Sequence, residues 1–235
     1  MQKNKSVVIS AYAPAECRST LEDLGFSVFD GAVLPSVDSA VAHHIDMQIV
    51  KCSDNSYVCA PCVYNHYLPV CSAADVILIS GKKDPLGKYP GDIGYNIAVT
   101  GKYAIHNFRY TDDVFCQNSG YIPINANQGY TKCNICVVGE SAVITSDSGI
   151  ARSLKKFPVD VLLIRSGYIE LPGYSYGFIG GCTGLIGSKL LAFAGDASLH
   201  PDYCNIKAFC KNHGVEICSL SKCNLVDVGT IMTVG

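Results

Sequence analysis

The strongest constraint on the fold of this chain is an internal repeat. The stretch that begins at Cys133 recurs at Cys182, 49 positions later. Asp147 and Asp196 align at the same offset, and each lies where a helix is expected to begin. Both copies have the pattern of two strands joined by a turn, a capping aspartate, a helix and a further strand. A repeat of this length predicts an architecture built from several copies of one small unit.

The same pattern recurs along the chain, by pattern rather than by residue identity. Further units start at Met47, Gly94 and Gly229, which gives successive spacings of 47, 39, 49 and 47 positions. The unit that starts at Gly229 is cut short at Gly235, and residues 6–29 carry the strand, helix and strand that it lacks. We therefore expect one α/β domain, residues 1–235. Its fold would be a five-fold pseudosymmetric α/β-propeller of ββαβ units, with the fifth unit closed by both termini.

Composition argues against several classes of function. Only 16% of the residues are charged, against roughly 25% in soluble domains, so we expect most elements to be largely buried. The net charge of −2 indicates neither nucleic acid nor an anionic membrane as a partner. No apolar run approaches the roughly 18 residues of a membrane span, and the amino-terminal run is too short for a signal peptide. We expect a cytoplasmic protein, and the sequence carries no firm signal for oligomeric state.

The 13 cysteines raise the question of a metal site. Two pairs have C-x-x-C spacing, Cys59 with Cys62 and Cys133 with Cys136, and such pairs can hold zinc. The second pair, however, falls in a predicted strand, where a spacing of three places the side chains on opposite faces. We favour reduced, packed thiols, and expect no metal and no cofactor. A zinc-binding protein remains the weakest of three functional hypotheses.

The most distinctive motif is the predicted hairpin of residues 128–145, QGYTKCNICVVGESAVIT. A glycine turn delivers Lys132-Cys133 to the start of an apolar strand, so this thiol lies at the beginning of a repeat unit. Polar motifs precede other units, namely His44-Ile45-Asp46 before the first and Asp227 before the fifth. The starts of equivalent units should converge on one axis, which predicts that Cys133 lies near Asp46.

Five ββαβ units, together with QGYTKC, TSDSGI, FIGGCTG and HPD, resemble the pentein fold of the guanidino-group-modifying enzymes, and most closely an uncharacterised bacterial family with that fold. The resemblance implies that Cys133 is a nucleophile and that His44 is a general acid and base. Carboxylates would bind a planar cation through charge-assisted hydrogen bonds, and Asp46 and Asp227 are the candidates. The candidate substrate contacts also include Lys132, Gln128, Gly180 and Gly181. Lys132 or a nearby histidine would lower the pKa of Cys133. Gly180-Gly181-Cys182 resembles a Gly-Gly-Asp motif of the family without its aspartate.

Two further hypotheses follow from this resemblance. The first is a thiol-dependent hydrolase or transferase that acts on a guanidino or amidine C–N bond of a small polar or cationic molecule, with chemistry like that of arginine deiminase or dimethylargininase. The second is a non-catalytic pentein, a binding or interaction module like the translation factor of that fold. The enzyme hypothesis requires the Cys133 sulfur and the His44 ring to share a central cavity, whereas the non-catalytic hypothesis expects them to lie apart.

Overall fold

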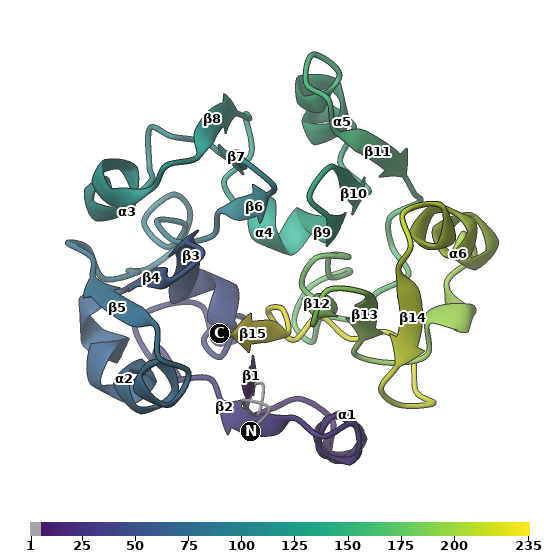
Figure 1. Ribbon diagram of the computed structural model, residues 1–235, viewed down its shortest axis with the longest axis horizontal. Coiled ribbons are helices and arrows are strands. Elements are labelled where there is room, and N and C mark those ends of the chain that lie inside the picture. The colour runs from purple at the N-terminus through teal and green to yellow at the C-terminus, as the bar shows by residue number, and fades with distance from the viewer. Residues whose placement is uncertain (1–5) are drawn as a thin grey trace.

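The five repeat units are present in chain order in the computed structural model, which describes residues 6–235. In each unit, a first and a second strand pair antiparallel, a helix follows, and a third strand pairs parallel with the second. The described residues thus form five three-stranded sheets. Figure 1 shows these sheets placed around a common centre, with the first strands innermost and the third strands and helices outside.

Each unit contributes one first strand, one second strand, one helix and one third strand. The first strands are β3 (Ile49–Ser53), β6 (Ala98–Thr100), β9 (Ile135–Gly139), β12 (Thr183–Ile186) and β15 (Met232–Val234). The second strands are β4 (Ser56–Cys59), β7 (Tyr103–His106), β10 (Ala142–Thr145), β13 (Leu190–Phe193) and β1 (Ser6–Ile9). The helices are α2 (Tyr64–Ala73), α3 (Asp113–Asn118), α5 (Ser148–Leu154), α6 (Tyr203–Asn212) and α1 (Ala15–Asp23). The third strands are β5 (Ile77–Ser80), β8 (Ile122–Asn125), β11 (Asp160–Leu163), β14 (Glu216–Ser219) and β2 (Ser27–Asp30).

Four short helical turns complete the set. Three are 3₁₀ turns, η1 (Ile45–Met47), η2 (Pro61–Val63) and η3 (Ala197–Leu199), and the fourth is the α-helical turn α4 (Thr131–Asn134). The turns η1 and α4 lead directly into the innermost strands β3 and β9, and both carry residues of the candidate site described below.

The two ends of the chain build the fifth unit together, as the split repeat predicts. β15 pairs antiparallel with β1, with Val234 opposite Ser6, and β1 pairs parallel with β2. Neighbouring units contact each other through their first strands, so that β6 touches β9, β9 touches β12 and β12 touches β15. The starts of the units therefore lie close together, although they are far apart in sequence.

Burial follows the position of each strand in its sheet. The second strands are the middle strands and are buried almost throughout, whereas the third strands are largely exposed edges. Val143 and Ile144 of β10, for example, are fully buried, and each such side chain stabilises the fold by about 1.5–3 kcal/mol. Asp147 caps α5 by accepting hydrogen bonds from the backbone N–H of Gly149 and Ile150, which confirms its predicted role as a helix cap.

One local prediction needs correction. Cys133 was expected in a strand but lies in α4, and the strand begins two residues later at Ile135. Thr131 stabilises this turn, because its Oγ1 donates to the backbone oxygens of Asn96 and Ile105, at 2.8 and 2.7 Å. The helix α2 contains the interior Pro69, and α6 begins at Tyr203, two residues after Pro201.

No helix within residues 6–235 has both the length and the apolar character needed to cross a membrane.

Candidate active site

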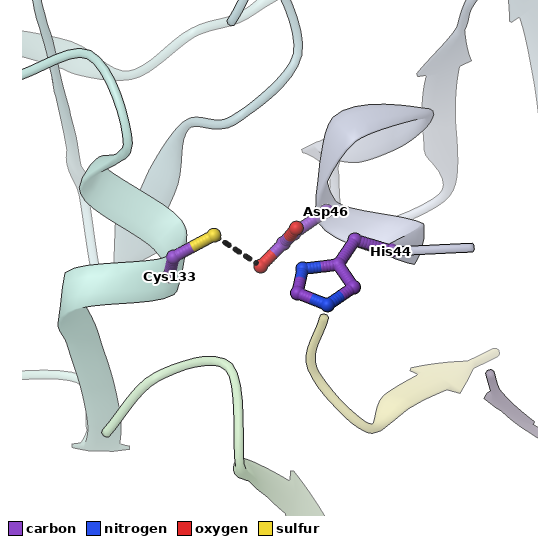
Figure 2. A group of neighbouring side chains, drawn as sticks. All are labelled: His44, Asp46 and Cys133. Atoms are coloured by element: carbon purple, nitrogen blue, oxygen red, sulfur yellow. Dashed lines mark hydrogen bonds between the residues drawn. The ribbon is translucent and has the colours of Figure 1, made fainter. Parts of the chain in front are cut away.

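Two turns from different units bring three of the predicted residues together (Figure 2). Cys133 lies in α4, His44 immediately precedes η1, and Asp46 lies within η1. The Cys133 thiol donates a hydrogen bond to Asp46 Oδ2 at 3.0 Å, across 87 positions of sequence. A donor atom of each of the three side chains lies within 4.8 Å of the others, and all three residues are buried.

Asp227, from the start of the fifth unit, completes the cluster. Its Oδ1 lies 3.7 Å from Nδ1 of His44, and both side chains are 1% exposed. The Asp227 carboxylate also accepts hydrogen bonds from the backbone N–H of Phe178 at 2.9 Å and of Gly229 at 3.1 Å. Gly229 has φ +69°, and a Cβ there would lie 2.3 Å from Cα of His44. Glycine is therefore required for the fifth unit to approach His44 this closely.

Asn96 holds Cys133 in place, and sequence reasoning missed it. Its Oδ1 accepts hydrogen bonds from the backbone N–H of Lys132 at 2.9 Å and of Cys133 at 3.2 Å. Its Nδ2 donates to the sulfur of Cys133 at 3.1 Å and to that of Met47 at 3.3 Å. Asn96 is fully buried, so this amide is dedicated to positioning the thiol.

A more accurate repeat register could have found Asn96. One residue stands two positions before each first strand, and these residues are Met47, Asn96, Cys133, Gly181 and Thr230. The sequence alignment placed the second unit at Gly94, two positions too early, which hid the equivalence of Asn96 and Cys133. It also placed the fourth unit one position too late, at Cys182, and the fifth one position too early, at Gly229.

A cavity of about 300 Å³ gives access to the cluster. His44, Cys133 and Asp227 line it. Asp46 does not line the cavity, but it accepts a hydrogen bond from the Cys133 thiol, which does. Tyrosines from several loops form much of the remaining wall. A larger cavity of about 460 Å³ is lined by apolar and hydroxyl side chains, most of them in or beside the first strands, and by Lys51 and Lys132. Among the described residues, no cysteine, histidine, aspartate or glutamate lines it.

The electrostatics of the cluster keep the resting thiol protonated. Burial raises the pKa of Cys133 well above its ordinary value, and the negative charges of Asp46 and Asp227 act in the same direction. The hydrogen bond from Asn96 has the opposite, smaller effect. Burial also raises the pKa of Asp227, while the nearby His44 lowers it. A positive charge in the cavity would lower the pKa of the thiol, because it would offset these carboxylates.

Several buried polar atoms of the cluster lack a partner within the described part of the chain. They are Nδ1 and Nε2 of His44 and Oδ1 of Asp46. Buried groups of this kind are nearly always hydrogen-bonded in proteins, so these atoms suit a ligand that carries N–H groups, or water. The imidazole, carboxylate and thiol are also a donor set that suits zinc.

The C-x-x-C pairs do not form such a group. Within residues 6–235, His44, Asp46 and Cys133 form the group of possible metal ligands, and neither Cys62 nor Cys136 belongs to it. All 13 cysteines are free thiols.

Two of the predicted substrate contacts point elsewhere. Lys132 Nζ donates to Thr230 Oγ1 at 2.7 Å and to the backbone oxygen of Gly180 at 3.3 Å, beside the larger cavity. It is not a cause of the shifted pKa of Cys133, so the expectation that Lys132 activates this thiol is wrong. Gln128 donates to Asp147 Oδ2 at 3.2 Å, in a separate surface pocket.

Gly180 and Gly181 serve close packing rather than contact with the cavity. A Cβ on Gly180 would lie 2.1 Å from the backbone oxygen of Lys132, and a Cβ on Gly181 would lie 1.9 Å from Asp227 Oδ1. Gly181 N–H also donates to the backbone oxygen of Cys133 at 3.0 Å. Neither glycine lines the cavity. Their absent side chains allow α4 and Asp227 to meet.

Fold and site together define a pseudosymmetric protein of five ββαβ units that carries a buried thiol, imidazole and carboxylate cluster at its centre. A solved structure with this fold is SxtG, an amidinotransferase from Microseira wollei in the saxitoxin biosynthetic pathway. It matches with a TM-score of 0.57 and 10% sequence identity, over 96% of this chain and 94% of that one.

The chain belongs to a family of unknown function, DUF6873, which matches residues 8–232. No curated protein sequence matches it.

Proposed function

We propose that this chain is a pentein, a five-bladed α/β-propeller, and that it is an enzyme in which Cys133 attacks the central carbon of a guanidino or amidine group. The observation that carries the proposal is the convergence of Cys133, His44 and Asp227 on one cavity, with Asp46 bonded to the thiol. The amidinotransferase activity named for SxtG, a protein of similar fold, supports the same class of reaction.

The bound cation would activate the nucleophile. A guanidinium beside Cys133 offsets the charges of Asp46 and Asp227, which lowers the pKa of the thiol. Its N–H groups can donate to the carboxylate of Asp227, which lines the cavity. The enzyme is therefore inert until a substrate of the right charge enters, which protects a buried thiol from unwanted reactions.

The first step would transfer the amidino carbon to sulfur. The thiol proton passes to the His44 ring, and the thiolate forms a C–S bond to the central carbon. The C–N bond to the leaving group then breaks with its electron pair on nitrogen, and His44 returns the proton to that nitrogen. An amine or ammonia departs, and an S-linked amidino group remains on Cys133.

The second step would remove the amidino group from Cys133. A water, or an acceptor amine, loses a proton to His44 as it attacks the same carbon. The C–S bond breaks with its electron pair on sulfur, and His44 returns the proton to the thiolate. Water gives urea if an amine departed in the first step and a ureido product if ammonia departed, which makes the enzyme a hydrolase. An acceptor amine gives a new guanidine, which makes it a transferase. Asp227, 3.7 Å from His44 Nδ1, stabilises the imidazolium formed in each step.

The structure favours this proposal over a non-catalytic module, for which a separated Cys133 and His44 would be expected. Zinc is a second candidate ligand of the same cluster, because a histidine, an aspartate and a cysteine have their donor atoms within 4.8 Å of one another. A cytoplasmic location remains our prediction, and 13 free thiols fit a reducing compartment.

The test is turnover of a panel of alkylguanidines and alkylamidines, followed as release of amine or ammonia and as ureido product. We expect Cys133→Ser to reduce turnover to the uncatalysed rate. Cys136→Ala is the matched control, because Cys136 is buried three positions away and does not line the cavity, and it should stay active. Turnover that survives Cys133→Ser would refute the nucleophile.

A further inference from the structure

Asp92 lines the same cavity, and one of its two carboxylate oxygens has no hydrogen-bond partner among the described residues. The residue is 2% exposed, and its Oδ2 accepts a hydrogen bond from the Tyr130 hydroxyl at 2.8 Å. Its Oδ1 is buried and has no hydrogen-bond partner in the described residues. A buried carboxylate oxygen without a partner is costly, so the position suits a donor that is not part of the chain.

The charged residues of the cavity wall favour a positively charged hydrogen-bond donor. Asp38, Asp92 and Asp227 line the cavity. Among the described residues of its wall, Lys88 is the only lysine or arginine, and Lys88 is exposed to solvent. Within residues 6–235, no arginine lines the cavity to bind a carboxylate in the usual bidentate way. Burial raises the pKa of Asp92, and the charge of Asp38 adds to this effect. A cation beside Asp92 would favour the ionised carboxylate, and so would oppose the effects of burial and of Asp38 on its pKa.

Aromatic rings lie beside this carboxylate. The ring centres of Tyr89 and Tyr130 are 5.7 Å apart, and Tyr130 binds Asp92 through its hydroxyl. Tyr174, also in the wall, has its pKa raised by burial and by the charges of Asp38 and Asp92. Tyrosine faces attract ammonium groups, which adds to the attraction of the two carboxylates.

We propose that the substrate is a dication, with its guanidino or amidine group at Cys133 and a primary ammonium group that donates to Asp92 Oδ1. This inference rests on the proposed function for the first of the two groups. Tyr130 lies three residues before Cys133 and bonds to Asp92, so it connects the two subsites. The structure thereby selects aminoalkylguanidines over guanidino acids and over plain alkylguanidines.

The experiment compares three ligands that differ at one end only. Each has a guanidino group and the same alkyl spacer, and the other end is an ammonium, a methyl or a carboxylate group. Spacer length is varied to find the best fit. Binding to the Cys133→Ser variant is measured by calorimetry and turnover by the wild-type chain is measured separately. We expect the ammonium ligand to bind about tenfold or more tightly than the methyl ligand, and the carboxylate ligand to bind most weakly.

The Asp92→Asn substitution, made in the same Cys133→Ser background, isolates the charge. Asparagine keeps an oxygen that accepts the Tyr130 hydroxyl, so that the wall of the cavity stays in place. The ratio of the ammonium to the methyl affinity should fall to near one. Asp38→Asn removes the same charge from the same cavity, but Oδ1 of Asp38 already accepts from Ala40 N–H at 3.1 Å. We expect it to reduce the ratio by less.

The outcomes separate this inference from the proposed function. Tight binding of the ammonium ligand without turnover would support the subsite and contradict the enzyme. Turnover of alkylguanidines without preference for the ammonium end, or a preference that survives Asp92→Asn, would overturn the subsite and leave the enzyme standing. Failure of all three ligands to bind would overturn both.

Discussion

The protonation of Cys133 offers a quantitative test of the site. Asp46 Oδ2 lies 3.0 Å from the thiol sulfur, so ionisation of the thiol places two negative charges in contact. At about 3 Å, with an effective dielectric constant of about 20, this repulsion is about 5 kcal/mol, or up to about 4 pKa units. Water in the cavity weakens it. We therefore expect Asp46→Asn to lower the pKa of Cys133 by about 2 units or more.

The assay is alkylation by iodoacetamide over a range of pH, read by mass spectrometry. Trypsin cleaves after Lys132 and Arg152, and the peptide between them contains both Cys133 and Cys136. Fragment ions separate the two thiols, which gives an internal control. Burial raises the pKa of Cys136 to about 11, with Thr183 and Lys132 opposing, and Asp46 has no part in that shift.

The expected result is a shift of the Cys133 profile to lower pH with the Cys136 profile unchanged. A Cys133 profile that stays in place, or moves to higher pH, would refute the electrostatic reasoning. An equal shift of both thiols would show that the substitution loosens the core, which is also contrary to the account.

Three other changes test the surrounding structure. Asn96→Ala removes the amide that holds Cys133, and should lower the free energy of unfolding in urea by about 2–4 kcal/mol and also reduce turnover. Gly181→Ala places a Cβ 1.9 Å from Asp227 Oδ1 and should destabilise the protein by about 1–3 kcal/mol in the same assay. Burial lowers the pKa of His106 from 6.5 to about 4. Because the depressed pKa favours folding only while the ring is neutral, about 3 kcal/mol of stability should disappear between pH 6.5 and 4.

Each of these has a contrary outcome. An Asn96→Ala variant as stable and as active as the wild type would show that the amide does not position the thiol. A fully stable Gly181→Ala variant would contradict the close approach of the fifth unit. Replacement of His106 by asparagine should flatten the loss of stability on acidification, and an unchanged loss would assign it to other groups.

The repeat could be predicted from the sequence because strands, turns and helix caps have local signals. Asp147 and Asp196 cap equivalent turns, and the alternation of elements repeats even where residue identity does not. The interior Pro69 hid α2, since proline costs a helix about 3 kcal/mol and only tertiary packing, here of Tyr67 and Val70, offsets it.

Much of the site depends on three-dimensional contacts that no local pattern encodes. The proximity of Cys133 and Asp46 followed from the repeat, because equivalent starts converge, whereas the roles of His44 and Asp227 came from the resemblance to the guanidino-group-modifying enzymes. The direction of the Lys132 side chain did not, since it is set by Thr230 and Gly180 from another unit. Asp92 and the tyrosine walls come from irregular loops, which carry no periodic signal and meet only in the folded chain.

The most direct test of the central claim is detection of the covalent intermediate. The protein is mixed with a guanidine that it turns over, quenched in acid, digested with trypsin and analysed by mass spectrometry. The account predicts an amidino group on the sulfur of Cys133, absent from Cys136 and absent from the Cys133→Ser variant. Product formation with no adduct on Cys133, or with the adduct on another cysteine, would contradict it.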